Sequence, residues 1–500
     1  MIRNLIEQAA ARHGETRYLE DASGTGTLSY AGLQGSARAW ADRLDRAGIP
    51  AGARIAVSLA DPLGYATALV SILAAGRVVV PLDPAAPAAE TSRLLAVARP
   101  EAVVSDAGSG PPGLALLGRP DGPEGAQPED AGPSPGGGPS PGGGGIYLCT
   151  SGTTGRPKGI LLSEDQLGHV AAEVATHHRL GPADRGYCCL PLFHVNAEVV
   201  GLLATLAAGA CLVLDGRFSR RGFWPLIERQ RITWVNAVPA IITVLAMDPA
   251  AAVPPGAGGR IRFVRSASAP LPPSALRRFE EAFGIPVIET YGMTEAASMI
   301  TANPLDGPRK PGSVGLPAGA EVRVVQLAAG RYVPCPAPVV GRVQIRGRGV
   351  ITRYADGAPA GAFDPEGWLD TGDLGHFDQD GYLFLAGRSD DVINRGGEKI
   401  YPREIEEVLL AQPGVGSAAV VGVRDEVLGE YPVAYVVPAG SWPAGPFEEA
   451  ELGKALRAAC EAALPRPKRP SVFCLVPELP VGPTGKVARR RLRELAMAGH

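Results

Sequence analysis

The sequence predicts an α/β fold in which a large N-terminal domain, built on parallel-rich sheets, is followed by a small mobile C-terminal α+β domain. The chain has 500 residues, which exceeds the size at which one hydrophobic core usually stops growing. From Arg54 onward, short β-branched runs alternate with longer helical patterns, and the composition changes near Gly387. Alternation of strands and helices favours a parallel sheet that helices cover on both faces.

The large domain is expected to span residues 1–387, beginning with a surface helix. Within it, residues 107–145 are mostly Gly, Pro and small polar residues, which cannot bury enough apolar surface to order themselves. We therefore expect a mobile surface crossing there. The predicted strands are 54–59, 78–82, 102–106, 210–215, 232–238, 261–267 and 286–290, with helical patterns that include 65–75 and 271–283.

The small domain is expected to span residues 392–500, after a hinge at 388–391. Ile405, Val408 and Leu409 fall on one face of a helical pattern, and Pro402 suits the first turn of that helix. Strands 416–423, 432–437 and 471–476 and a helix at 449–463 complete the domain.

The composition is that of a soluble globular protein. Hydrophobic residues make up 45% and charged residues 20%, with a net charge of -3, so the basic excess of a nucleic-acid binder is missing. We expect neither a secretion signal nor a membrane span, because the apolar stretches are shorter than the roughly 20 residues that cross a bilayer. Seven cysteines without CxxC spacing indicate free thiols in a reducing cytoplasm.

The segment YLCTSGTTGRPKG at 147–159 places a strand-like run before a loop of small hydroxyl residues and glycines. Such a loop can offer N–H groups, hydroxyls and cations to a polyphosphate, although composition alone also allows a flexible turn. It is not a Walker A motif, because Pro157 stands where that helix would begin. The loop resembles the phosphate-binding motif of the adenylate-forming superfamily, which includes acyl-CoA synthetases, peptide-synthetase adenylation domains and luciferases. The resemblance implies that ATP is bound by Thr150, Ser151, Gly152, Thr153, Thr154 and Lys158.

The segment YGMTE at 291–295 resembles the next motif of that superfamily. There the aromatic residue stacks near adenine, and the Thr-Glu pair serves the nucleotide and a magnesium ion. A lone carboxylate beside a phosphate loop suits Mg²⁺, which commonly takes one or two carboxylates. The resemblance assigns Thr294 and Glu295 catalytic roles, Glu295 and Thr153 to the metal, and Ser268, Ala269, Pro270, Thr290, Tyr291, Gly292 and Met293 to the nucleotide.

Three further segments continue the resemblance in family order. LDTGDLG contains Asp373, the family's ribose-binding carboxylate, which can accept both hydroxyl protons. GRSDDVINRGGEKI contains Arg388, implied to reach the ribose and phosphates, and Asp390 at the hinge position. PVGPTGKVARR places Lys486 where the family has its catalytic lysine, a point cation that stabilises charge on the carboxylate and α-phosphate.

The resemblance implies that an acid attacks the α-phosphate while pyrophosphate leaves, and that the small domain then rotates to admit an acceptor. Glycines permit close approach of a narrow thiol arm, so the acceptor channel is expected at Gly396, Gly397 and Lys399. His194 corresponds to a gate beside the carboxylate, although it could be a purely structural histidine. The acid pocket is expected at His194, Asn236, Val238 and Met293.

Segments 216–227, 303–315 and 393–406 are most similar to the oxalyl-CoA synthetase and coumarate-CoA ligase branch. We therefore expect an ATP-dependent acyl-CoA synthetase using Mg²⁺, with coenzyme A as acceptor. A stand-alone amide synthetase that transfers the acyl group to an amine is the alternative. A phosphoryl-transfer ATPase and a non-catalytic nucleotide binder are weaker alternatives. Glu289-Thr290 replaces the Gln-Gly usual in coumarate ligases, which leaves the acid open, with a small or aromatic acid favoured.

Overall fold

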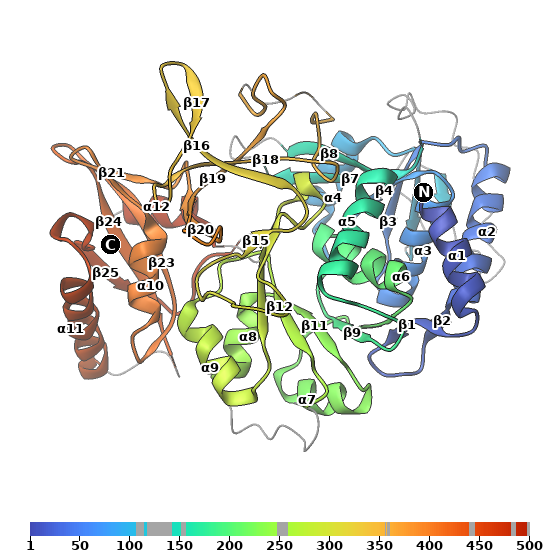
Figure 1. Cartoon of the computed structure of the whole chain (residues 1–500), viewed down its shortest axis with the longest axis horizontal. Helices are drawn as coiled ribbons and strands as arrows, with labels where there is room; N and C mark the ends of the chain where they lie inside the picture. Colours follow the sequence, from blue (N-terminus) through green and yellow to red (C-terminus); the bar gives the residue numbers. More distant parts are fainter. Residues whose placement is uncertain are drawn as a thin grey trace.

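Four β-sheets organise the part of the chain that the structure describes (Figure 1). This computed structural model describes residues 1–106, 115–117, 143–151, 157–247, 259–355, 357, 361–439, 446–481 and 487–497. Two sheets are mostly parallel and carry helices, so the predicted α/β fold class is confirmed. Most of the expected crossing at 107–145 lies outside the described residues.

A nine-stranded sheet is parallel at its centre and antiparallel at both ends. Its order is β15 (Leu316–Pro317), β14 (Thr301–Ala302), β13 (Val287–Tyr291), β12 (Phe263–Ser266), β11 (Trp234–Ala237), β9 (Arg185–Cys188), β10 (Cys211–Leu214), β1 (Arg17–Asp21) and β2 (Thr27–Ser29). Ala237 is level with Ser266, and Ser266 with Glu289. The carboxyl ends of β11, β12 and β13 therefore meet at one edge, where ligands of open α/β sheets usually bind.

The second parallel-rich sheet has six strands. Its order is β6 (Ala115–Leu117), β5 (Ala102–Ser105), β3 (Arg54–Ser58), β4 (Val78–Pro81), β7 (Gly145–Ser151) and β8 (Pro157–Ser163). Only the β7–β8 pair is antiparallel among these described strands. The phosphate-loop segment thus connects β7 to β8, at the end of a sheet whose other strands all run in one direction.

Helices cover both faces of the nine-stranded sheet. The large domain contains α1 (Ile2–His13), α2 (Tyr30–Arg46), α3 (Pro62–Ala74), α4 (Ala88–Ala98), α5 (Glu164–His177), η1 (Asn196–Leu203, a π-helix), α6 (Ala204–Ala208), α7 (Arg220–Arg229), α8 (Pro239–Ala246), α9 (Pro273–Phe283) and η2 (Thr294–Ala296). Helix α3 packs between the two parallel-rich sheets, contacting β1 of one and β3 and β4 of the other. It is apolar around nearly its whole circumference, as expected of a helix enclosed on all sides.

A five-stranded antiparallel sheet follows, which the sequence analysis did not predict. Its order is β17 (Arg331–Pro334), β16 (Glu321–Ala328), β18 (Gly341–Arg346), β19 (Leu369–Phe377) and β20 (Leu383–Arg388). The final residue of β20, Arg388, is also the first residue of the expected hinge. This sheet therefore leads the chain directly from the large domain to the small one.

The small C-terminal domain packs α-helices against both faces of a mixed sheet, drawn in orange and red beside α8 and α9 in Figure 1. The sheet order is β22 (Glu398–Ile400), β21 (Ile393–Arg395), β24 (Gly429–Pro438) and β23 (Val415–Asp425), with β25 (Val472–Leu475) parallel to β24. Its helices are α10 (Pro402–Leu410), α11 (Pro446–Ala463), η3 (Arg466–Lys468) and α12 (Arg489–Met497). Ile405 and Leu409 are fully buried. The boundary expected at 388–391 stays a prediction.

Across the described residues, none of the helices combines the length and the apolar character that crossing a lipid bilayer requires.

Candidate active site

Three residues from separate segments meet at the carboxyl edge of the nine-stranded sheet. The Tyr291 hydroxyl, at the end of β13, donates a hydrogen bond to Asp373 Oδ2 at 2.5 Å. Asp373 is level with Arg388 in the β19–β20 pair, and Arg388 Nη1 donates to Asp373 Oδ1 at 3.2 Å. Arg388 also lies 3.6 Å from Asp390 Oδ1. The structure thus brings together the residues predicted for adenine, ribose and hinge.

The charges in this cluster shift the pKa of its members. Burial raises the pKa of Tyr291, and the neighbouring Asp373 carboxylate raises it further. For Arg388, burial lowers the pKa but the carboxylates of Asp373 and Asp390 raise it more, so the net shift is upward. At neutral pH the tyrosine therefore stays a hydrogen-bond donor and the arginine stays cationic.

A second group connects the end of the phosphate loop with Glu295. Glu295 is 8% exposed, and its Oε1 accepts a hydrogen bond from the Tyr354 hydroxyl at 3.0 Å. Lys158 Nζ lies 5.6 Å from the centroid of the Tyr354 ring, within reach of a cation–π interaction. The sequence analysis missed Tyr354, because a single tyrosine outside any motif gives no signal. Tyr354 holds one oxygen of the carboxylate that was predicted to bind the metal.

The turn after β13 requires glycine at Gly292. A Cβ atom at this position would lie only 1.2 Å from the carbonyl oxygen of Ser298. Ala297 and Ser298 both have positive φ, so the chain folds back sharply onto the turn. The Thr290 hydroxyl donates to the carbonyl oxygen of Ser266 and therefore joins β13 to β12. This close packing fixes Tyr291 and Glu295 relative to the sheet edge.

The expected acid pocket adjoins a buried amide pair. Asn236 is fully buried and donates to Asn196 Oδ1 at 3.2 Å, while Asn196 donates to Ser268 Oγ at 3.2 Å. Ser268, Ala269 and Pro270 are exposed at the sheet edge. Val238, Met293 and His194 are half-buried, and the His194 ring contacts that of Phe193. Asn196, which the sequence analysis missed, lies between Asn236 and the edge.

Several predicted site residues lie outside the described part of the chain. Gly152, Thr153, Thr154 and Lys486 belong to undescribed segments. The main chain of Thr150 and Ser151 forms the end of β7, and their side chains are undescribed. Their assigned roles stay predictions.

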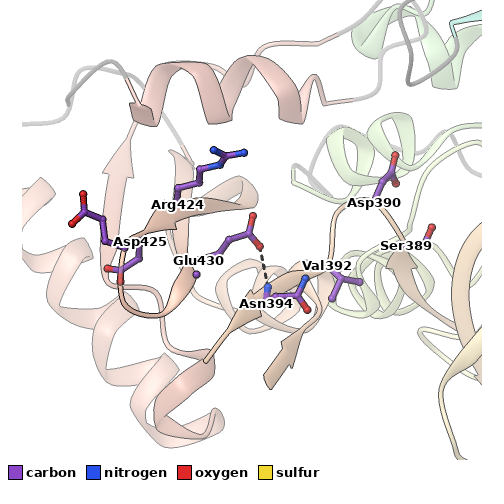
Figure 2. Close-up of a pocket in the computed structure, with 9 residues that line it drawn as sticks. Ser389, Asp390, Val392, Asn394, Arg424, Asp425 and Glu430 are labelled. Atoms are coloured by element: carbon purple, nitrogen blue, oxygen red, sulfur yellow. Dashed lines mark hydrogen bonds between the residues drawn. The ribbon is translucent and has the colours of Figure 1, made fainter. Parts of the chain in front are cut away.

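A cleft of about 760 Å³ lies beside the expected hinge (Figure 2). It is lined by Ser389, Asp390, Val392, Asn394, Arg424, Asp425, Glu426, Gly429 and Glu430. Figure 2 shows the Glu430 side chain pointing toward Asn394, whose main-chain N–H donates to its carboxylate at 2.9 Å. Four of the lining residues are acidic and one is basic, so the cleft is unsuited to the phosphates of a nucleotide.

The residues expected in the acceptor channel lie on the neighbouring β21–β22 hairpin. Gly396 and Gly397 occupy its turn with φ of 58° and 90°, and Lys399 is exposed. The Gly396 N–H donates to the carbonyl oxygen of Leu428, which joins this turn to the β23–β24 hairpin. The left-handed backbone explains both glycines without reference to an acceptor.

Comparison with known proteins identifies the class. The chain belongs to the AMP-binding enzyme family, whose model matches residues 6–355. The model of the AMP-binding enzyme C-terminal domain matches residues 404–486. The predicted membership of the adenylate-forming superfamily is therefore confirmed.

Several of the proteins that the chain is similar to are named as CoA ligases or CoA synthetases. The chain is 46% identical over 350 residues to a sulfoacetate–CoA ligase of Cupriavidus necator, and 40% identical over 352 residues to an oxalate–CoA ligase of Arabidopsis thaliana. Each alignment covers 69% of this chain and 66% of the relative, slightly less than two thirds of the relative's length. The structure of o-succinylbenzoate CoA synthetase from Bacillus subtilis, in complex with its acyl-adenylate intermediate, matches with a TM-score of 0.81 at 26% identity. That match covers 98% of both chains.

A buried carboxyl group lies where the sheet meets the small domain. Glu289, one residue before Thr290, is 2% exposed, and its Oε1 accepts from the main-chain N–H of Leu271. Burial raises its pKa to about 7, although Arg403 on helix α10 lowers the pKa in part. Arg403 in turn donates to the carbonyl oxygen of Gly312 at 3.3 Å. Glu289 thus places a titrating group where the sheet meets helix α10.

We predict that Glu289→Gln makes stability less dependent on pH. A folded-state pKa of about 7, above the ordinary 4.5, means that the folded chain binds this proton more tightly. That stabilisation is complete below pH 4.5 and is lost as pH rises through 7, a change of roughly 3 kcal/mol. In thermal unfolding, the melting temperature of the variant should rise relative to that of the natural chain as the pH is raised from 5 to 8.

The exposed Glu281 on α9 provides the matched control. Glu281→Gln should leave the pH profile unchanged. A melting-temperature difference between Glu289→Gln and the natural chain that is the same at pH 5 and pH 8 would contradict the prediction.

Proposed function

We propose that the protein is an ATP-dependent carboxylic acid–CoA ligase. It forms an acyl-adenylate with release of pyrophosphate and then transfers the acyl group to coenzyme A. The observation that carries this proposal is the contact of Tyr291, Asp373 and Arg388 at the carboxyl edge of the sheet. Membership of the AMP-binding family and relatives named as CoA ligases support it.

In the first step, a carboxylate oxygen of the acid attacks the α-phosphorus of ATP, and the bond to pyrophosphate breaks. Such a transfer needs mainly positioning and charge stabilisation from the protein. Asp373 and Arg388 hold the ribose, with Tyr291 and the main chain of 268–270 beside the adenine. Lys158, with Thr153 and Thr154, holds the departing phosphates. Lys486 stabilises the charge on the reacting oxygens.

Glu295 is suited to hold magnesium. The Tyr354 hydroxyl donates to Oε1, and Oε2 is the oxygen that we propose to contact the metal. Thr153 and the phosphates of the nucleotide would supply further oxygen ligands, since Mg²⁺ commonly takes only one or two carboxylates. Magnesium, when bound there, neutralises charge on the β- and γ-phosphates. Thr294, directly before Glu295, starts the short helix η2 that orients the carboxylate.

In the second step, the acceptor attacks the acyl carbon and AMP leaves. We place the pivot at Asp390 and the acceptor channel at Gly396, Gly397 and Lys399. Arg466, Lys468 and Arg469 are proposed to supply cations to a CoA phosphate, and of these Lys468 pairs with Glu404 at 2.8 Å. An amine acceptor, giving an amide, is the second candidate. The acidic cleft beside Asp390 favours it, because a cationic amine is attracted to carboxylates.

The acid is proposed to be small. Sulfoacetate and oxalate, after which two relatives are named, are both short acids with two acidic groups. Seven free cysteine thiols suit a reducing compartment, which supports a cytoplasmic location.

The proposal is tested by pyrophosphate exchange into ATP over a panel of carboxylic acids. Mass spectrometry with coenzyme A or amines then identifies the acceptor. Acid-dependent exchange followed by a thioester is the expected result. Release of ADP, or exchange with none of the acids, would overturn the proposal.

We predict that Lys486→Ala nearly abolishes exchange while leaving ATP binding intact. The lysine is proposed to stabilise charge that develops only during the reaction, so its loss affects the rate more than binding. Exchange rates and ATP affinity, measured together, separate the two effects.

The exposed Lys454, which pairs with Glu451 on α11, is the control. Lys454→Ala should retain full exchange. Near-normal exchange by Lys486→Ala would refute its assigned role.

We also predict that Tyr354→Phe raises the Mg²⁺ concentration needed for half-maximal exchange about tenfold. The substitution keeps the ring beside Lys158 but removes the hydrogen bond that orients Glu295, and such supporting contacts matter for metal affinity. Titration of Mg²⁺ at saturating acid measures the effect.

Tyr382→Phe is the matched control, since the Tyr382 hydroxyl donates to the carbonyl oxygen of Pro308 instead. It should leave the Mg²⁺ requirement unchanged. An unchanged requirement in Tyr354→Phe would show that Tyr354 does not support the metal ligand.

A further inference from the structure

Arg265 is a fully buried arginine one residue before the end of β12. Its Nη1 donates to Asn196 Oδ1 at 2.9 Å and to Asn236 Oδ1 at 3.2 Å. Its Nε and Nη2 are buried and have no hydrogen-bond partner among the described residues. A buried charge is costly unless it is paired and hydrogen-bonded, so this guanidinium needs an explanation.

The described surroundings do not neutralise Arg265. Burial and the arginine itself lower the pKa of His177 and His178, which keeps both rings neutral. Burial raises the pKa of Cys188 to about 11, so the thiol is protonated. Glu198 on η1 is fully buried with both carboxyl oxygens unpartnered, and burial raises its pKa as well. Because neither carboxyl oxygen of Glu198 accepts a hydrogen bond from Arg265, Glu198 is not its counterion.

The two amide side chains connect this buried charge to the sheet edge through hydrogen bonds. Both amide oxygens face Arg265, which fixes the orientation of the two NH₂ groups. Asn236 Nδ2 donates to Asn196 Oδ1, and Asn196 Nδ2 donates to Ser268 Oγ at 3.2 Å. Ser268 is exposed and has φ of 74°, a strained conformation for a serine. The network therefore runs from a buried cation to a hydroxyl at the edge proposed for the adenylate.

We propose that Arg265, Asn196 and Ser268 recognise a second anionic group on the acid, so that the substrate is a short acid with two acidic groups. Asn196 Nδ2 and Ser268 Oγ contact that group, and Arg265 determines specificity by orienting the amides and supplying the countercharge. Hydrogen bonds to charged groups in such surroundings are strong, and sites built around them reject analogues that lack the partner. The acid is short because Ser268 belongs to the segment 268–270, whose main chain is proposed to line the adenine pocket.

This inference rests on the proposed ligase function, and pyrophosphate exchange tests both. Oxalate, malonate and sulfoacetate are compared with acetate, propionate and benzoate. The natural enzyme should prefer the doubly acidic substrates by about 100-fold or more in kcat/KM. Arg265→Met should lower kcat/KM for these acids about 100-fold while leaving the singly charged acids within a few-fold. A merely structural role would lower both classes together.

Arg262, on the chain segment leading into β12, is the matched control. It forms a 2.7 Å ion pair with Asp184, so Arg262→Met should affect stability and leave the ratio between the two classes unchanged. If Arg265→Met does not fold, Ser268→Gly tests the same idea at an exposed position whose positive φ suits glycine. It should reduce the preference about tenfold.

The outcomes are distinguishable. A natural enzyme that prefers singly charged acids overturns the inference, as does an unchanged ratio in Arg265→Met or, where that variant does not fold, in Ser268→Gly. Exchange with none of the acids overturns the proposed function itself.

Discussion

The contact between Tyr291, Asp373 and Arg388 is the interaction on which the rest of the site depends. It joins the last residue of β13 in the parallel-rich sheet to neighbouring strands of the antiparallel sheet, across 82 residues of sequence. Arg388 is also the first residue of the expected hinge, and it pairs with Asp390 there. One carboxylate thus connects two sheets and the start of the small domain. A displacement of Asp373 would move the proposed ribose site and the hinge together.

Strand direction explains why this site can exist at one edge. Because β11, β12 and β13 are parallel, segments that follow each strand emerge side by side, although they are far apart in the sequence. The turn at Gly292 then needs a close approach to Ser298, which only glycine allows. Packing at this turn sets the position of Glu295. Tyr354, from a distant segment, then orients the Glu295 carboxylate through a hydrogen bond. The geometry is therefore a property of the sheet and its turns jointly.

The strands of the parallel-rich sheets and the motif residues could be predicted from the sequence. The residues that contact and orient the motif residues could not. Alternating β-branched runs predicted β3, β4, β11 and β13 because buried parallel strands are continuously apolar. The antiparallel sheet at 321–388 was missed, since its half-exposed strands mix apolar and charged residues. Tyr354, Asn196 and Arg265 were missed for another reason. Each acts through a contact with a residue distant in sequence, and spacing along the chain carries no trace of such contacts.

Two buried ionisable residues near the edge occupy opposite faces of the sheet. Arg265 shares its face with Phe263 and lies beneath Asn196, whereas Glu289 shares its face with Val287 and lies near Arg403 of the small domain. The pleat keeps the two residues apart, although their strands are direct neighbours. Arg265 and Glu289 therefore cannot neutralise one another, and each interacts with the groups on its own face of the sheet. Arg265 lies on the face that is proposed to select the acid, and Glu289 lies on the face near helix α10.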